Sequence, residues 1–299
     1  MDQKDYFSTL AQNPENFEEL NACPWCGGTS YQSWGEQSYK GFLTVVCDHC
    51  AVVYVKRRFN ELGRKRLCDG YLSVRQENKR AAKRELAHDL ELEFMYRHVR
   101  SGSVCDVGCG GGYLLERMPA GHWEKWGTEL GSAAVERARR VLETDRIYAG
   151  EVEALPLPEN YFDLVIARGV IEHVPSPRSF LQTVAGLVKD DGFLFMSGPN
   201  LASFCAQFYK DRWKLHYPEA HLFHFSVRHL TDALDELDFS LVSDAYHYLE
   251  TPYANPEEDL LKIAGDITAR REGRHDSISD ESPPFYGNRY TAIWKKAKR

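Results

Sequence analysis

The sequence predicts an α/β protein built around a mostly parallel sheet, with a small separate module ahead of it. Strand-like and helix-like segments alternate regularly after Gly102, a pattern typical of parallel strands joined by covering helices. A glycine-rich turn, residues 108–112, follows the first of these strands, and two Cys-x-x-Cys pairs stand within residues 21–56. We therefore expect two different parts, residues 1–75 and residues 76–299.

The N-terminal part opens with a polar lead-in, residues 1–20, followed by two short β-rich runs at 43–46 and 52–55. A basic connector, residues 57–75, comes next. From about residue 76 to 99, apolar side chains recur every four or five positions, which is the spacing of a helix with one buried face. The recurring side chains are Leu86, Leu90, Phe94 and Val99.

The alternating region predicts the main sheet, because short apolar runs indicate strands and the periodic segments between them indicate helices. The expected strands are residues 103–107, 125–129, 147–148, 162–167, 192–197, 240–248 and 286–295. The expected helices are residues 113–118, 132–142, 177–188 and 226–237, the last with Ser226 as its N-cap. Sheets of this kind bind ligands at the carboxyl ends of their strands.

Two later stretches depart from the alternation. Residues 198–226 are dense in aromatic side chains and histidine, and residues 251–284 are polar, with many acids and several prolines. Connections in α/β units usually have about 2–6 residues. We therefore expect residues 201–226 and 251–284 to be lid segments or insertions, the first of them forming a wall over a ligand pocket.

Composition and charge narrow the class of protein. The chain has 299 residues, 43% of them hydrophobic, and a net charge of −7, which argues mildly against a nucleic-acid binder. No apolar run is long enough to span a membrane and the polar N-terminus lacks the pattern of a secretory signal, so we expect a cytoplasmic protein. Eleven Lys or Arg and three acids nevertheless lie within residues 56–84. This basic stretch is either a solvated helix face or a surface for an anionic partner.

The two cysteine pairs predict a metal site. Cys23 and Cys26 are separated from Cys47 and Cys50 by twenty residues, the spacing of a four-cysteine zinc ribbon. Four thiolates close the coordination sphere of Zn²⁺, so the site would be structural. The alternatives are a redox dithiol pair and simple core cysteines. Position 51, often glycine after such a pair, is Ala51 here.

The glycine-rich turn predicts a nucleotide-type site. Glycines such as Gly108 and Gly110 let the backbone approach a ligand closely. Asp106, two residues before the first glycine, suits an ammonium group and would repel a pyrophosphate. Glu129 ends the second strand, where a carboxylate can accept hydrogen bonds from both ribose hydroxyls. Tyr113 stands at the third glycine position of a dinucleotide motif, which further argues against NAD.

With these segments in order, residues 102–200 resemble a class I methyltransferase that uses S-adenosylmethionine (SAM). The matching segments are DVGCGGG, ALPLPENYFDLV, GVIEHV and DGFLFMSGPN. Residues 21–75 and the later segment PNLASF…HLFHFS are similar to bacterial members with an N-terminal four-cysteine ribbon, often linked to glycan or natural-product biosynthesis. The resemblance implies a Rossmann-like, mostly parallel seven-stranded sheet with an antiparallel last strand, plus the small N-terminal zinc ribbon.

The resemblance also implies roles for particular residues. The backbone of Gly108 and Gly110 would lie against the methionine part of SAM, whose ammonium Asp106 would orient. Glu129 would hold the ribose and Glu151 the adenine amino group. The remaining implied contacts are Leu130, the Val152 backbone at the adenine ring, and Arg168 near the methionine end.

Histidines are the candidates for chemistry on the acceptor. His173 follows the fourth strand, where the pocket should open, and is either a general base or a structural residue of the loop. His221 is a second candidate for catalysis and for acceptor binding, and His224 and Trp213 are candidates for acceptor binding. The alternative for these three is a packing role within the lid.

Three functions remain open. The first is methyl transfer from SAM to a small-molecule or sugar acceptor, with or without a phosphate, in an enzyme that carries a structural zinc ribbon. The second is an RNA methyltransferase that docks nucleic acid on the ribbon and the basic connector. The third is a non-catalytic, zinc-dependent interaction module on a methyltransferase fold. The acids and glycines of the cofactor motifs favour an enzyme.

Overall fold

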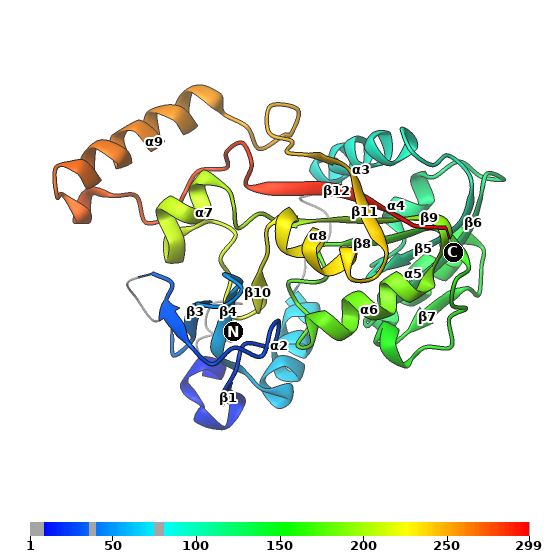
Figure 1. The fold of residues 1–299 in the computed structure, drawn as a ribbon, viewed down its shortest axis with the longest axis horizontal. Coiled ribbons are helices and arrows are strands. Elements are labelled where there is room, and N and C mark those ends of the chain that lie inside the picture. The colour runs from blue at the N-terminus through cyan, green and yellow to red at the C-terminus, as the bar shows by residue number, and fades with distance from the viewer. Residues whose placement is uncertain (1–8, 36–39, 75–80, 299) are drawn as a thin grey trace. The chain divides into compact units, whose positions relative to one another are not determined.

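The computed structural model describes residues 9–35, 40–74 and 81–298, which divide into two compact units (Figure 1). The central unit comprises Glu85–Asn200, Phe225–His247 and Arg289–Arg299. The N-terminal unit comprises Met1–Arg84, Leu201–His224 and Tyr248–Asn288. Most of the segments predicted as lids therefore group with the N-terminal residues, whereas the sequence prediction assigned them to the methyltransferase domain.

The central unit confirms the predicted sheet. Within the described residues, seven strands pair in the order β11-β12-β9-β8-β5-β6-β7. β12 is antiparallel to both of its neighbours, and the remaining pairs are parallel. The strands are β5 (Gly102–Val107), β6 (Trp123–Glu129), β7 (Ile147–Ala149), β8 (Phe162–Arg168), β9 (Val188–Pro199), β11 (Phe239–Ala245) and β12 (Arg289–Lys296).

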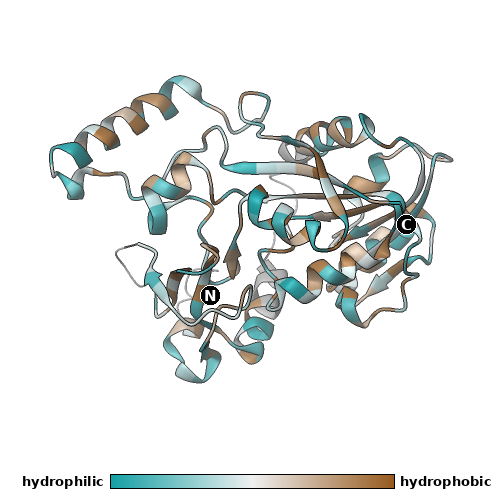
Figure 2. Cartoon of the chain, viewed as in Figure 1, coloured by the Kyte–Doolittle hydropathy of each residue, from teal (hydrophilic) through white to brown (hydrophobic). Residues whose placement is uncertain are grey.

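Helices cover both faces of this sheet. The helices are α3 (Ala81–Tyr96), α4 (Tyr113–Arg117), α5 (Ser132–Leu142), α6 (Pro177–Leu187) and α8 (Val227–Asp235). Side chains of α3, α4 and α5 pack in one core cluster with Leu164 and Ile166 of β8. Val165, which lies between these two residues on β8, points to the opposite face. α6 and α8 cover that face. Figure 2 shows the apolar character concentrated along these central strands.

Most predicted elements of the central unit are present with shifted ends. β9 begins at Val188, four residues before the predicted start, because the chain passes from α6 into the strand without a loop. Ser226 is the N-cap of α8, as predicted, and its side chain accepts a hydrogen bond from the His229 backbone N–H. Within the described residues, no helix has the length and apolar character that crossing a membrane requires.

The N-terminal unit is built around β4 (Val53–Phe59). One edge of β4 pairs with β3 (Leu43–Cys47), which in turn pairs with β2 (Tyr31–Ser33). The other edge is shared. β1 (Phe17–Glu19) pairs with its second half, and β10 (Phe223–His224) pairs with Tyr54 and Val53 in its first half. The lid segment therefore contributes a strand to the sheet that carries the cysteines.

Helices of the N-terminal unit surround a second core. The helical elements are η1 (Pro14–Asn16), α2 (Glu61–Val74), α7 (Phe204–Tyr209), η4 (Lys210–Arg212), α9 (Pro256–Arg271) and η5 (His275–Ser277). The core cluster joins Trp34 and Val53 to Trp213 and to Ile263 of α9. α9 lies inside the polar stretch 251–284, where the sequence analysis expected no helix.

The basic stretch 56–84 begins in the last residues of β4 and continues into the helix α2, and several of its described cations already have partners. Arg58 lies 2.8 Å from Glu18, Arg66 lies 2.7 Å from Glu15, and Lys56 pairs with Glu19. The side chains of residues 68–84 lie outside the described part of the chain. These ion pairs indicate that the first part of the basic stretch holds η1 and β1 in place.

Candidate functional site

The four predicted zinc ligands converge in the N-terminal unit. The sulfur atoms of Cys23 and Cys50 are 3.8 Å apart, those of Cys26 and Cys47 are 3.5 Å apart, and all four lie within 4.8 Å of one another. A tetrahedral zinc site with Zn–S bonds of about 2.3 Å requires S–S separations of about 3.8 Å. The hydrogen bond to Cys50 lowers the pKa of Cys23 to about 5. The cluster therefore has the size and donor set of a closed four-thiolate zinc site.

Two matching backbone turns present these sulfurs. Gly27 N donates to Cys23 O at 2.8 Å, and Ala51 N donates to Cys47 O at 2.9 Å. The residue after each pair is left-handed, with φ of 77° at Gly27 and 59° at Ala51. Alanine is strained in this conformation and glycine is not. The first turn is thus relaxed, and the second carries a small conformational cost.

The glycine turn of the central unit follows β5 directly. Gly108, Gly110 and Gly112 all have positive φ, between 55° and 79°. A Cβ on Gly110 would meet nothing within 4 Å, so open space lies over this peptide. A Cβ on Gly108 would clash with Val170 at 2.7 Å, so the turn packs closely against the loop after β8 on that side. The open side is where a ligand can approach the backbone.

Arg137 of α5 supports this turn from behind. Its guanidinium donates to the carbonyl of Gly111 and lies 3.8 Å from the centre of the Tyr113 ring. Tyr113, the residue that departs from a dinucleotide motif, therefore serves as a platform for the arginine. This role of Arg137 was not predicted from the sequence.

Glu129 closes the turn at the end of β6. Its Oε2 accepts from Gly110 N at 2.9 Å, and its Oε1 accepts from Leu130 N at 2.8 Å and from Gly131 N at 3.0 Å. These bonds fix the carboxylate between the glycine turn and the start of α5. Leu130 itself is 66% exposed, so its side chain flanks the site from the solvent side.

Asp106 is buried under the same turn, with 3% of its surface exposed. Burial raises the pKa of Asp106 to about 7, Arg168 opposes the rise, and Glu91 and Glu129 add to it. A buried carboxylate of this kind is stabilised by a cation brought to it. The site therefore favours an ammonium group over an anion at this point.

Arg168 is the last residue of β8, one residue beyond the predicted end of that strand, and pairs with Glu91 of α3. Glu91 is buried and also accepts a hydrogen bond from Ser197 Oγ at 2.8 Å. Neither Glu91 nor Ser197 was among the residues predicted from the sequence. The available signal was an acid on the buried side of a helix, four residues before the buried Met95.

The other predicted site residues of the central unit lie in the segments that follow β7 and β8. Glu151 is exposed just before η3 (Val152–Ala154), and Val152 is buried. His173 is exposed in the loop after β8, whereas its neighbour Glu172 is buried. All the residues predicted to bind SAM therefore belong to the central unit.

The remaining candidates lie in the N-terminal unit. Trp213 and His224 are buried, with 2% and 1% of their surface exposed, and their rings are 5.2 Å apart. His216 Nδ1 and His224 Nε2 are 2.9 Å apart, and burial lowers the pKa of both rings. His221 is half-buried, with Nδ1 2.8 Å from the carbonyl of Leu215. Burial favours the packing alternative for Trp213 and His224.

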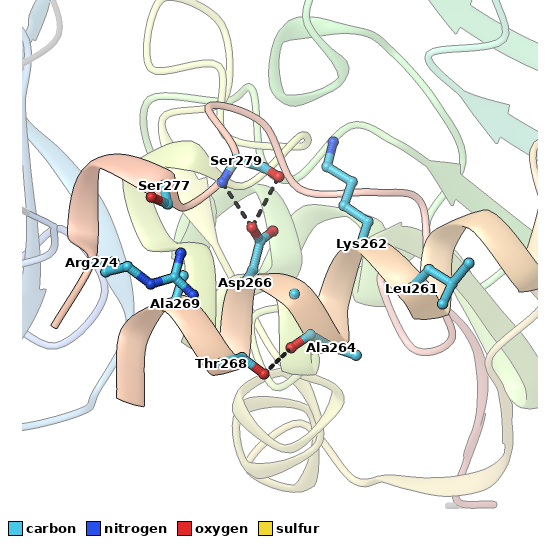
Figure 3. Close-up of a pocket in the computed structure, with 10 residues that line it drawn as sticks. Leu261, Lys262, Ala264, Asp266, Thr268, Ala269, Arg274, Ser277 and Ser279 are labelled. Atoms are coloured by element: carbon cyan, nitrogen blue, oxygen red, sulfur yellow. Dashed lines mark hydrogen bonds between the residues drawn. The ribbon is translucent and has the colours of Figure 1, made fainter. Parts of the chain in front are cut away.

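A surface hollow of about 600 Å³ lies beside α9 in the same unit (Figure 3). Within it, Asp266 accepts hydrogen bonds from the backbone N–H and the hydroxyl of Ser279 at 2.9 and 3.0 Å. Tyr209 donates to the other oxygen of Asp266 at 2.6 Å. Both oxygens of Asp266 are thus used within the fold, and we assign the hollow no ligand.

Comparisons with known proteins identify the central unit. A ubiquinone biosynthesis O-methyltransferase from Nitrosospira multiformis is 36% identical over 118 residues, which cover 37% of this chain and 49% of that protein. The chain therefore spans about half the length of the curated relatives it matches.

Solved structures show the same fold at low identity. A SAM-dependent methyltransferase from Thermotoga maritima is 18% identical with a TM-score of 0.53, covering 77% of this chain and 98% of that one. The [4+2]-cyclase SpnF is 19% identical with a TM-score of 0.51, covering 71% of this chain and 82% of that one. The fold alone thus leaves the reaction open, but residues 76–244 match the methyltransferase domain family, and the chain belongs to that family.

Proposed function

We propose that this chain transfers a methyl group from SAM to an oxygen of a small-molecule acceptor. The observation that carries the proposal is the arrangement of Asp106, Glu129 and the glycine turn at adjoining strand ends. A buried acid, a fixed carboxylate and an open backbone match the ammonium, the ribose and the methionine chain of SAM. The name of the relatives, O-methyltransferases of ubiquinone biosynthesis, supports a small-molecule acceptor.

In this proposal the residues bind and orient the cofactor. Glu129 accepts from the ribose hydroxyls, and its three backbone donors hold it ready for that role. Asp106 holds the ammonium, while Glu151 and the Val152 backbone contact adenine. SAM supplies an activated methyl group, and positioning of the acceptor in line with it provides much of the rate.

We also propose that one structural zinc ion is bound by Cys23, Cys26, Cys47 and Cys50. Four thiolates leave no open position on the metal, so zinc would stabilise the fold and take no part in the chemistry. The sulfur separations and the paired turns support this assignment.

His173 and His221 remain our candidates for the acceptor side, each on its own unit. Removing a general base usually costs about 10²–10⁴-fold in rate. We expect His173→Ala to lower kcat by such a factor with little change in SAM affinity. His221→Ala should also lower turnover without changing SAM affinity. Full turnover in both variants would remove the two histidines from the proposal.

Two alternatives stay open for the acceptor, a glycan and an RNA. The ion pairs of Lys56, Arg58 and Arg66 favour a structural interpretation of the described part of the basic stretch. Incubation with labelled SAM and separate panels of phenols, glycans and RNA, read by mass, would identify the acceptor class.

Calorimetry with SAM tests the cofactor directly. We expect Glu129→Ala to weaken SAM binding by roughly 1–3 kcal/mol, the usual cost of losing a charged hydrogen-bond partner. Glu136→Ala, an exposed change on α5, is the matched control. Unchanged affinity in the Glu129 variant would show that the ribose lies elsewhere.

A further inference from the structure

Glu91 connects three elements at the ligand edge of the central sheet. It projects from α3 and is 8% exposed. Its Oε2 pairs with Nε of Arg168, the last residue of β8, and its Oε1 accepts from Ser197 Oγ on β9 at 2.8 Å. Arg168 and Ser197 are direct partners in the parallel ladder. Both oxygens of Glu91 are therefore committed, and they fix the direction of the Arg168 side chain.

Arg168 also acts on Asp106. Its charge lowers the pKa of that buried carboxyl, while the charge of Glu91 raises it. The arginine side chain is 29% exposed and that of Glu91 is 10% exposed. The guanidinium is thus paired with a buried carboxylate and is still partly accessible to a ligand.

The methionine end of SAM carries two opposite charges, an ammonium and a carboxylate. Asp106 can pair with the ammonium, and a cation close to Asp106 would pair with the carboxylate. A guanidinium has five N–H donors in one plane, so it can keep its bond to Glu91 through Nε and still engage a ligand carboxylate. The plane of such a fork must be fixed for this to give specific binding.

We propose that Glu91 is a positioning residue that holds Arg168 in the orientation in which it binds the carboxylate of SAM. This inference rests on the proposed function and extends it to a residue on the helix before the first strand of the sheet. Glu91 contacts the arginine and not the ligand. Ser197 keeps Glu91 in place from the neighbouring strand.

The test compares two probes in calorimetry, S-adenosylhomocysteine and 5′-methylthioadenosine. The second keeps the adenine and ribose and lacks the amino-acid end. We expect Glu91→Gln to weaken binding of S-adenosylhomocysteine by about 10-fold or more, as for a charge-assisted bond. Binding of 5′-methylthioadenosine should stay within about twofold, and KM for SAM should rise with kcat little changed.

Glu93→Gln is the matched control, because Glu93 lies on the same helix, is exposed and pairs with Arg97 at 2.9 Å. It should change neither affinity. Ser197→Ala provides a milder second variant in case Glu91→Gln does not fold, and it should show the same selective loss at smaller size. Equal losses for both probes, or none, would overturn the inference. Wild-type protein that binds neither probe would instead overturn the proposed function.

Discussion

The two units of this molecule bury charge in opposite ways. The central unit has apolar strands, and its buried acids, Asp106, Glu91 and Glu172, lie at the edge formed by the carboxyl ends of the strands. The N-terminal unit buries Asp259 and Asp266 on the inner face of α9, where tyrosine hydroxyls satisfy them at 2.5 and 2.6 Å. Its exposed face carries Leu260 and Leu261. The buried acids of the central unit thus lie where sheets of this kind bind ligands, whereas those of the N-terminal unit are hydrogen-bonded within the unit itself.

The largest effect should follow from removing a metal ligand. Structural zinc contributes roughly 10–16 kcal/mol of apparent binding free energy in zinc-finger peptides. Cys47→Ser should therefore remove about one zinc per chain and increase hydrogen exchange in residues 43–59 and also in 201–224, because β10 pairs with β4. Residues 102–200 should keep their protection.

Metal analysis and hydrogen exchange would check this, with Cys105→Ser, a buried cysteine of β5, as the control for losing a thiol. Protection lost in both units at once would show that the central unit also depends on the cysteine cluster.

The next effect concerns the buried acids of α9. Asp266→Ala removes the partner of Tyr209 and of Ser279, and each unsatisfied buried group costs about 1–3 kcal/mol. We expect the midpoint of urea unfolding of the N-terminal unit to fall accordingly. Asp276→Ala, an exposed change on η5, should have little effect. An Asp266 variant with unchanged stability would mean that the apolar contacts of Ile263 are enough to hold α9 in place.

Replacing Asp106 should have the opposite effect on stability from replacing Asp266. Its pKa of about 7 in the folded chain exceeds the usual value of about 4, so ionisation destabilises the fold progressively as pH rises from about 4 through 7. Asp106→Asn should raise the free energy of unfolding of the SAM-free protein, by more at pH 8 than at pH 5. It should weaken SAM binding at the same time.

Thermal unfolding at the two pH values and calorimetry check this pair of effects. A variant that loses stability at pH 8 would show that the carboxylate is structural.

The sequence predicted the central sheet well for a physical reason. Strands buried on both faces, such as β8, are short continuous apolar runs, and the cofactor motifs sit at their ends. It did not predict α9, because Asp259 and Asp266 occupy the positions where the helical pattern requires apolar side chains. It did not predict β1 either, since the pairing of Glu18 with Arg58 comes from a partner strand 40 residues away.

The residues of the candidate site differ in the same way in how far they could be predicted from the sequence. Glu129 and the four cysteines could be placed from spacing, because their roles depend on backbone turns. Glu91 could not, because its partners come from β8 and β9, strands remote in sequence.

The smallest predicted effect lies in the second cysteine turn. Ala51 has φ of 59°, so Ala51→Gly should relieve strain and raise stability by about 1 kcal/mol or less. Gly27→Ala, at φ of 77° in the first turn, should lower stability by a similar amount. Chelator titration of the zinc-loaded protein would measure both, and opposite signs are required.

The shared edge of β4 has a consequence for synthesis on the ribosome. When β4 emerges, β3 can already pair with one of its edges, but the first half of the other edge lacks its partner β10 until residues 223 and 224 are made, about 170 residues later. The central sheet is also incomplete until late, because β12 lies between β9 and β11 and pairs with both. β12 ends at Lys296. Both units should therefore finish late and together, after a period in which open strand edges are exposed to other chains. A nascent chain halted near residue 220 should be an aggregation-prone species, even though most of its strands have already been made.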